Sequence, residues 1–254
     1  MHRSNEPTRR LFTRAGISAG MRVLEVGCGS GEVTSLLAQM VGSAGFVLAV
    51  DSNQHALNAA EQRLLSDGAR NFRFMCADVS DPRALLCQSE ATTFDAVAGR
   101  RVLMYLDDPV AVLSGLRRWL SRDCIVVFEE IASTLGSGGS VSMPAHEQAS
   151  RWLSGMLDAE GAERSLGLQL PSVYARAGFV PDGIWAEAVI EGQGEQYSLG
   201  ELLSLLQERL AAAGIASKSD IESLLQELAD EAADPGNVYV SSMRVCARGQ
   251  NTLT

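Results

Sequence analysis

The stretch VLEVGCGSGE, residues 23–32, decides how the rest of this sequence is interpreted. It places Gly27, Gly29 and Gly31 within five positions, directly after an apolar run. Glycine adopts backbone conformations that other residues avoid, and it lets the backbone approach a ligand closely. A glycine-rich turn between a buried strand and a helix is typical of a nucleotide-binding loop, and the stretch therefore predicts one.

Two carboxylates, Glu25 and Glu32, flank these glycines. The dinucleotide fingerprint GxGxxG requires a glycine where this chain has Glu32, and the spacing here is GxGxG. A carboxylate in the first turn of a helix competes with a pyrophosphate for the positive end of the helix dipole. We therefore expect a nucleoside ligand that has no phosphate and carries positive charge near the loop. S-adenosylmethionine (SAM), with its ammonium and sulfonium groups, fits this description.

Apolar runs and helical patterns alternate through the first half of the chain. Strands are expected at 21–26, 45–51, 71–78, 93–99 and 124–130, and helices at 31–41, 55–68 and 109–120. Strands that are apolar throughout are buried on both faces, which predicts a parallel sheet covered by helices on both sides.

The second half begins with a segment rich in glycine and serine. Helices are expected at 144–163 and 171–179, strands at 180–192 and 237–249, and an amphipathic helical pair, capped by Ser198 and by Ser219 or Asp220, between those strands. We therefore expect a cofactor-binding core at 1–131, a cap insertion with a helix at 132–179, and C-terminal strands at 180–254 that carry a helical insertion at 198–233.

Further turn and acidic positions fall at the ends of the expected strands. Asp51 ends the second strand, where its carboxylate can accept both ribose hydroxyls; a helix N-cap is the alternative. Asp78 follows the third strand and can accept from an adenine amino group, while Val79 can offer its backbone N–H to the ring. Gly99 and Arg100 close the fourth strand, where backbone carbonyls can accept from an ammonium group. Ligands of open α/β sheets bind at this edge.

Four motifs together resemble the class I SAM-dependent methyltransferases of the bacterial small-molecule type: EVGCGSG (25–31), VLAVDSN (47–53), CADVSD (76–81) and FDAVAGRRVLMYLDDP (94–109). The resemblance implies an α/β fold with a Rossmann-like, seven-stranded, mostly parallel sheet in the order 3-2-1-4-5-7-6, the last strand antiparallel, and an additional helical cap. It also implies SAM as the cofactor. The implied cofactor-binding residues are Glu25, Gly27, Cys28, Gly29, Gly31, Asp51, Ser52, Asp78, Val79, Gly99 and Arg100.

No dedicated catalytic base is evident, so the candidates follow from position. His146 is the histidine of the expected cap, and Glu129 and Glu130 end the fifth strand near the expected methyl group. A surface histidine and an exposed carboxylate are the alternatives. Tyr105 and Trp152 are candidates for substrate binding, with core packing as the alternative.

Composition limits the partners. The net charge of −10 over 254 residues repels nucleic acid. No apolar stretch reaches the roughly 18 residues of a membrane span, and the N-terminus has no apolar signal-peptide core, so we expect a cytoplasmic protein. The five cysteines form no CxxC pair, which indicates reduced core thiols and no metal site. The amphipathic pair at 198–232 could also form a homodimer contact.

These observations predict a SAM-dependent methyltransferase that acts on a small molecule, a specialised metabolite. A quinone methyltransferase is one alternative. A SAM-binding protein that transfers no methyl group, such as a cyclase or a binding module, is another. The stretch GRRVLMYL (99–106) lacks the NPPY-type tetrad that would favour methylation of amide or exocyclic-amine nitrogen.

Overall fold

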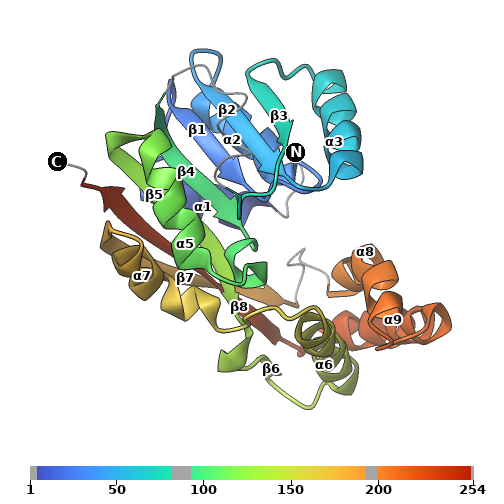
Figure 1. Cartoon of the computed structure of the whole chain (residues 1–254). Coiled ribbons are helices and arrows are strands. Elements are labelled where there is room, and N and C mark those ends of the chain that lie inside the picture. Colours follow the sequence, from blue (N-terminus) through green and yellow to red (C-terminus); the bar gives the residue numbers. More distant parts are fainter. Residues whose placement is uncertain (1–4, 82–92, 193–198, 253–254) are drawn as a thin grey trace. The chain divides into compact units, whose positions relative to one another are not determined.

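The computed structural model describes residues 5–81, 93–192 and 199–252 (Figure 1). Its α-helices are α1 (Glu6–Ala15), α2 (Glu32–Val41), α3 (Gln54–Ser66), α5 (Pro109–Leu116), α6 (Pro144–Ala159), α7 (Leu166–Arg176), α8 (Leu199–Ala212) and α9 (Lys218–Ala233). Its strands are β1 (Arg22–Val26), β2 (Phe46–Asp51), β3 (Phe72–Cys76), β4 (Phe94–Arg100), β5 (Leu120–Ala132), β6 (Gly138–Gly139), β7 (Phe179–Glu191) and β8 (Tyr239–Asn251). The strands that the sequence predicts are all present, with ends that differ by a few residues.

The strands form one sheet in the order β3-β2-β1-β4-β5-β8, in which β7 also pairs with β8. Since β7 and β8 are the sixth and seventh long strands, the predicted order 3-2-1-4-5-7-6 is confirmed. The pairings of β1 with β2 and β4, of β2 with β3, and of β4 with β5 are parallel. The two-residue strand β6, which was not predicted, pairs antiparallel with β8.

The chain divides into two compact units. The first, here called the core unit, comprises residues 1–130, 167–185 and 245–254. The second, here called the helical unit, comprises residues 131–166 and 186–244. Helix α7 is therefore grouped with the core unit. Each unit is described by itself below.

One face of the core unit's sheet packs against α1 and α2. Val23, Ala98 and Val127, from three neighbouring strands, belong to one apolar cluster with side chains of these two helices. Helix α1, which was not predicted, buries Leu11 and Phe12 in that cluster. Burial of side chains of this size stabilises the fold by about 1.5–3 kcal/mol each.

Local capping fixes where several helices begin. Pro109 is at the first turn of α5, as predicted, and Asp108 accepts from the Ala111 N–H as the N-cap. Helix α9 begins at a capping box of Ser217 and Asp220, so the prediction of Ser219 or Asp220 as the N-cap was wrong by two or three residues. The predicted cap Ser198 lies outside the described residues.

The predicted helix at 171–179 begins earlier than expected. Helix α7 runs from Leu166 to Arg176 and contains Pro171 in its interior. Proline lacks the N–H that an internal helix position needs, and for this reason we expected the helix to begin at Pro171. Leu166 and Leu170 are buried, and their packing supports the additional turn.

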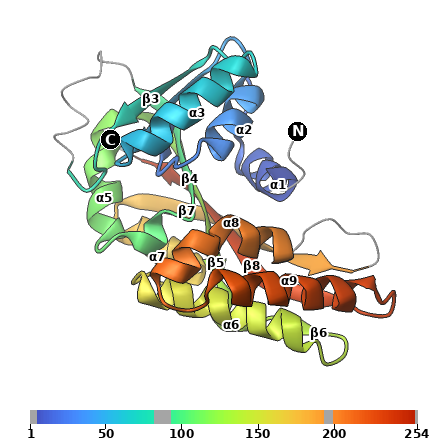
Figure 2. The same cartoon turned by 90° about the vertical axis from the view of Figure 1, so that its right-hand side faces the viewer.

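The helical unit is built from α6, α8 and α9, which pack against one another (Figure 2). Leu203 of α8 and Leu224 of α9 are buried together with Ala149 of α6. These contacts account for the amphipathic pattern of α8 and α9, and the homodimer stays a prediction. Within the described residues, no helix is both long and apolar enough to cross a membrane.

Candidate active site

The glycine loop connects β1 to α2, as the sequence predicts. Gly27, Gly29 and Gly31 have φ angles of +68°, +48° and +74°, which favour glycine strongly. The N–H groups of Gly27 and Cys28 both donate to the Val50 carbonyl oxygen, at 2.8 and 3.1 Å. These bonds fix the loop to the end of β2.

The three glycines differ in what surrounds them. A Cβ atom at Gly27 would lie 2.2 Å from Val102 Cγ2, and one at Gly31 would lie 2.9 Å from Ala60 Cβ. A Cβ atom at Gly29 would meet nothing within 4 Å. Gly27 and Gly31 are therefore required by packing, whereas the open side of Gly29 is where a ligand can approach the backbone.

Asp51 lies beside this open part of the loop. Its Oδ2 accepts from the Gly29 N–H at 2.8 Å, and its Oδ1 accepts from the Asn53 N–H at 2.9 Å. Asn53, not Asp51, caps α3, since its side chain accepts from the Ala56 N–H. The alternative interpretation of Asp51 as a helix N-cap is therefore wrong. Each carboxylate oxygen keeps a second lone pair for a ligand hydroxyl.

Glu25 is a buried carboxylate at the end of β1, with 1% of its surface exposed. Its Oε2 has no hydrogen-bond partner. Burial raises the pKa of Glu25 to about 7, against the opposing effects of the Thr34 hydroxyl and the Arg100 charge. A buried carboxylate oxygen without a partner is suited to a cationic ligand, so the site fits the ammonium group of SAM.

Glu32 and Arg100 form an ion pair at 3.0 Å. Arg100 also donates to Asn5 Oδ1 at 2.9 Å and to Thr8 Oγ1 at 3.2 Å, so its side chain joins the start of α1 to that of α2. The prediction gave the negative charge of Glu32 a direct role in selecting the ligand. Because Arg100 compensates that charge, the expected selection of a cationic ligand depends instead on Glu25.

The remaining predicted cofactor positions lie at the ends of β2, β3 and β4. Ser52 is exposed and its carbonyl accepts from the Cys76 thiol; Asp78 is exposed and its Oδ1 accepts from the Ser80 N–H at 2.8 Å; Val79 is buried.

Gly99 and Cys28 have packing roles in the core unit. A Cβ atom at Gly99 would lie 2.6 Å from Phe128 Cε1. Cys28 is buried in the apolar cluster, and burial raises the pKa of its thiol far above the usual range. The thiol therefore stays protonated, which agrees with a small packing residue and not with a nucleophile.

Glu129 and Glu130 end the part of β5 that belongs to the core unit, and both are buried. Because side chains alternate along a strand, they point to opposite faces of the sheet. Neither oxygen of Glu129 has a hydrogen-bond partner. Glu130 Oε1 accepts from the N–H groups of Val102 and Leu103, at 3.1 and 2.8 Å. Tyr105 lies on the same turn, in a 3₁₀ segment, and is 39% exposed.

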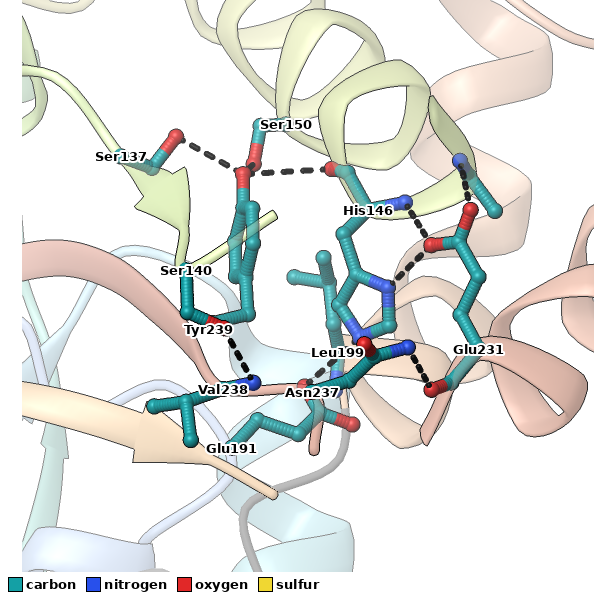
Figure 3. Close-up of polar contacts among 11 residues, drawn as sticks. Ser137, Ser140, His146, Ser150, Glu191, Leu199, Glu231, Asn237, Val238 and Tyr239 are labelled. Carbon is teal, nitrogen blue, oxygen red and sulfur yellow. Dashed lines mark hydrogen bonds and ion pairs between the residues drawn. The ribbon is translucent and has the colours of Figure 1, made fainter. Parts of the chain in front are cut away.

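His146 lies on α6 in the helical unit and is fully buried, so the alternative of an exposed histidine is wrong. Its Nδ1 is 2.6 Å from Glu231 Oε2, and its Nε2 is 3.7 Å from Glu191 Oε2 (Figure 3). Burial lowers the pKa of His146, but the two carboxylates outweigh it and the net shift is upward. The imidazole contacts the ring of Tyr239 in a tilted arrangement, with ring centroids 4.9 Å apart.

Tyr239 continues this polar network. Its hydroxyl is 2.7 Å from Ser150 Oγ and donates to Ser137 Oγ at 2.9 Å (Figure 3). Trp152, on the same helix as His146, is partly buried against the apolar core of the helical unit. Core packing accounts for this position, and a role of Trp152 in substrate binding stays a prediction.

Sequence reasoning missed four residues that shape these sites. Val102 was not singled out, although it contacts Gly27, and Thr8 was not connected with Arg100. Glu191 and Glu231 were not connected with His146. Each pair is far apart in the sequence, so no local pattern carried a signal; the acidic type of the last two residues was the one available hint.

The fold and site define a class of protein. A Rossmann-like sheet with a GxGxG loop, an acidic residue ending β2 and no phosphate-selecting fingerprint is that of the class I SAM-dependent methyltransferases. A family model described as a methyltransferase domain matches residues 17–164, which is more than half of the chain. The chain therefore belongs to this methyltransferase domain family.

Individual relatives agree with this assignment. The Ubiquinone biosynthesis O-methyltransferase of Neisseria meningitidis is 28% identical over 112 residues, 44% of this chain and 44% of that protein. Aklanonic acid methyltransferase DauC of Streptomyces is 32% identical over 106 residues, 42% of this chain and 46% of that protein. The chain thus aligns with less than half the length of these two curated relatives.

Solved structures share the fold over a larger part of the chain. The YcgJ protein from Bacillus subtilis has a TM-score of 0.61 at 14% identity and is covered completely, as is this chain. The [4+2]-cyclase SpnF has a TM-score of 0.59 at 18% identity, with 99% of this chain and 82% of SpnF covered. At these identities the likeness concerns the fold alone.

Proposed function

We propose that this protein transfers a methyl group from SAM to a small-molecule acceptor, a specialised metabolite. The observation that carries the proposal is the buried, unpartnered Glu25 carboxylate beside the open Gly29 and the acceptor Asp51. This arrangement suits a nucleoside that carries a cation and no phosphate. SAM supplies an activated methyl group on a sulfonium when it is bound.

Different residues of the core unit bind different parts of SAM. Glu25 accepts from the ammonium group, and Asp51 accepts from the ribose hydroxyls while its own backbone bonds hold the carboxylate in place. Asp78 accepts from the adenine amino group, and Val79 donates its backbone N–H to the adenine ring. The backbone carbonyls of Gly99 and Arg100 also accept from the ammonium group of SAM. Tyr105 contributes to binding of the methyl acceptor. Methyl transfer then depends chiefly on alignment and on excluding water, which a preorganised loop provides.

Two groups are proposed as acceptors of a substrate proton. Glu129 is buried and both its oxygens lack partners. His146, which is buried in the helical unit, is the other group: its Nδ1 is 2.6 Å from Glu231 Oε2, and its Nε2 has no hydrogen-bond partner but lies 3.7 Å from Glu191 Oε2. Because both carboxylates favour the protonated imidazole, His146 accepts a proton only at a pH above its raised pKa. Glu130 differs from both, because Val102 and Leu103 occupy one of its oxygens.

Labelled methyl transfer tests the proposal. The full chain is incubated with methyl-labelled SAM and size-fractionated metabolite extracts, with a quinone precursor as a separate acceptor. We expect label in low-molecular-weight product together with S-adenosylhomocysteine. Label on protein or RNA would contradict the substrate class. Cofactor binding without S-adenosylhomocysteine from any acceptor would favour the cyclase or binding-module alternative.

A quinone acceptor is a second candidate. The similarity to a Ubiquinone biosynthesis O-methyltransferase supports it, although the matched segment is 44% of that relative. The separate quinone arm of the assay distinguishes it from a specialised metabolite.

The substitution Glu25→Gln is expected to move cofactor affinity and stability in opposite directions. The raised pKa means that ionised Glu25 destabilises the fold increasingly as the pH rises from 4.5 through about 7. The variant should therefore be more stable than the wild type at pH 8, by about 1–3 kcal/mol. It should nevertheless bind SAM at least about tenfold more weakly, because the neutral amide cannot pair with the ammonium group.

Denaturation at pH 5 and pH 8, together with calorimetry of SAM binding, measures both effects. Asp51→Asn is the matched control, because it also lowers affinity but breaks a bond to the Gly29 or Asn53 N–H and so lowers stability. Unchanged SAM affinity in the Glu25 variant would contradict the proposed ammonium contact.

A further inference from the structure

Glu130 is a fully buried carboxylate that contacts the turn after β4. Its Oε1 accepts from two consecutive backbone N–H groups, those of Val102 and Leu103, at 3.1 and 2.8 Å. Its Oε2 has no partner. A single oxygen of Glu130 thus satisfies two backbone donors from a segment 27 and 28 residues earlier in the chain.

The turn that Glu130 holds has an unfavourable backbone. Arg101 has a φ angle of +53°, and it is the one non-glycine residue with positive φ in the described part of the chain. Such a conformation persists where surrounding contacts enforce it. The Arg101 N–H donates to the Glu129 carbonyl oxygen at 2.8 Å. The end of β5 therefore supports the turn through one backbone bond and one carboxylate.

Val102 connects this turn to the glycine loop. A Cβ atom placed on Gly27 would lie 2.2 Å from Val102 Cγ2 and 2.6 Å from Val102 Cβ. The side chain therefore fills the space that the missing Cβ leaves. A displacement of Val102 would remove the packing that limits where Gly27 can lie.

We propose that Glu130 is a positioning residue for the cofactor loop: it fixes the turn at 101–103, and Val102 transmits that position to Gly27. This inference rests on the proposed SAM site. It replaces the expectation of proton transfer by Glu130 with a role in positioning the cofactor loop, because Oε1 of Glu130 holds two backbone N–H groups of the turn. The residue acts through Val102 and needs no contact with substrate or cofactor.

The protonation state of Glu130 determines which substitutions preserve its hydrogen bonds and which remove them. Burial raises the pKa of Glu130 to about 8, against the lowering effect of the Leu103 and Val102 N–H groups. The side chain is therefore mostly neutral at pH 7, and glutamine reproduces both its shape and its acceptor oxygen. Leucine keeps the volume and removes the acceptor.

The experiment compares Glu130→Gln with Glu130→Leu by calorimetry of SAM binding. Glu130→Leu should raise the Kd for SAM about tenfold or more, since the backbone N–H groups of Val102 and Leu103 lose their acceptor. Glu130→Gln should stay within about threefold of wild type in both Kd and kcat. If Glu130 instead transfers a proton, Glu130→Gln will lose kcat while its Kd is unchanged, and that result would overturn the proposal.

A double-mutant cycle tests the route through Val102. In the background of Val102→Ala, adding Glu130→Leu should weaken SAM binding by much less than about tenfold. If the fold-changes in Kd of the two single variants multiply in the double variant, Glu130 acts by another route, and the proposal would be overturned.

Hydrogen exchange keeps the test independent of the cofactor. Amides in 26–32 and 101–103 should exchange about tenfold or more faster in Glu130→Leu than in Glu130→Gln, without any ligand. Equal exchange in the two variants would overturn the proposal. A wild-type protein that does not bind SAM, with the exchange difference present, would instead refute the proposed function alone.

Discussion

Replacing Gly27 with alanine should lower the free energy of unfolding by about 3 kcal/mol and abolish measurable SAM binding. The new Cβ would lie 2.2 Å from Val102 Cγ2, inside any permitted contact distance. The backbone φ of +68° is also unfavourable for a residue with a Cβ. The loop must therefore move away from the turn after β4, and its contacts with the cofactor move with it. Chemical denaturation and calorimetry measure the two losses.

Two other glycines separate the steric effect from the backbone effect. Gly20 has φ +85° and Gly29 has φ +48°, and a Cβ on either would meet nothing within 4 Å. Gly20→Ala should therefore cost about 1 kcal/mol of stability and leave SAM binding intact. Gly29→Ala should cost a similar amount but weaken SAM binding, because its open side faces the expected ligand. Equal stability losses for Gly27→Ala and Gly20→Ala would show that the contact with Val102 is not the reason for a glycine at position 27.

The contrast among these glycines shows what the sequence could predict. The loop itself follows from a local pattern, three glycines after an apolar strand, and the structure places it between β1 and α2. The reason for each glycine is not local. Gly27 is required by Val102, which lies 75 positions later in the numbering, and no pattern within the loop separates this case from that of Gly29.

Charge was predictable by residue type but not by partner. Glu25 and Glu32 both flank the glycines, and the sequence treats them alike. The structure separates them, because Glu32 pairs with Arg100 whereas Glu25 keeps an unpartnered oxygen. The expected preference for a cationic ligand therefore depends on one carboxylate, Glu25, instead of two. Side-chain pairing across β4 and α2 is a tertiary property that periodicity does not encode.

The sheet was predictable for a physical reason that the helical unit lacks. Apolar strands that alternate with helices admit few topologies, and strand ends mark the ligand edge. The helical unit has amphipathic helices whose partners the pattern cannot choose. His146 illustrates this, since its burial depends on Glu231, 85 residues away.

Glu231 is the residue on which the helical unit's buried polar network depends most. One carboxylate accepts from the Ala145 N–H at 2.8 Å, from the His146 N–H at 3.1 Å, and from His146 Nδ1 at 2.6 Å. It therefore joins α9 to the first turn of α6, where it also faces the positive end of the helix dipole.

Glu231→Gln should lower the stability of the helical unit by about 3 kcal/mol, because the buried His146 would lose the carboxylate at 2.6 Å and keep only Glu191, at 3.7 Å, as a counter-charge. Glu227→Gln, an exposed position on the same helix, is the matched control and should change stability by less than about 0.5 kcal/mol. Hydrogen exchange of the amides of Ala145 and His146 reports this unit specifically. Equal exchange in the two variants would contradict the assignment.

The pH dependence of this pair has a definite sign. The raised pKa of His146 means that its contribution to stability is present below pH 6.5 and is lost as the pH rises through the folded-state value. The pKa of Glu231 is lowered: partial burial opposes the shift, but the Ala145 N–H and His146 outweigh it. Its contribution is therefore present above pH 4.5 and is lost as the pH falls. The wild-type unit should be most stable between these limits, and its decline above pH 6.5 should be weaker in Glu231→Gln, whereas a decline of unchanged steepness in that variant would show that another group titrates.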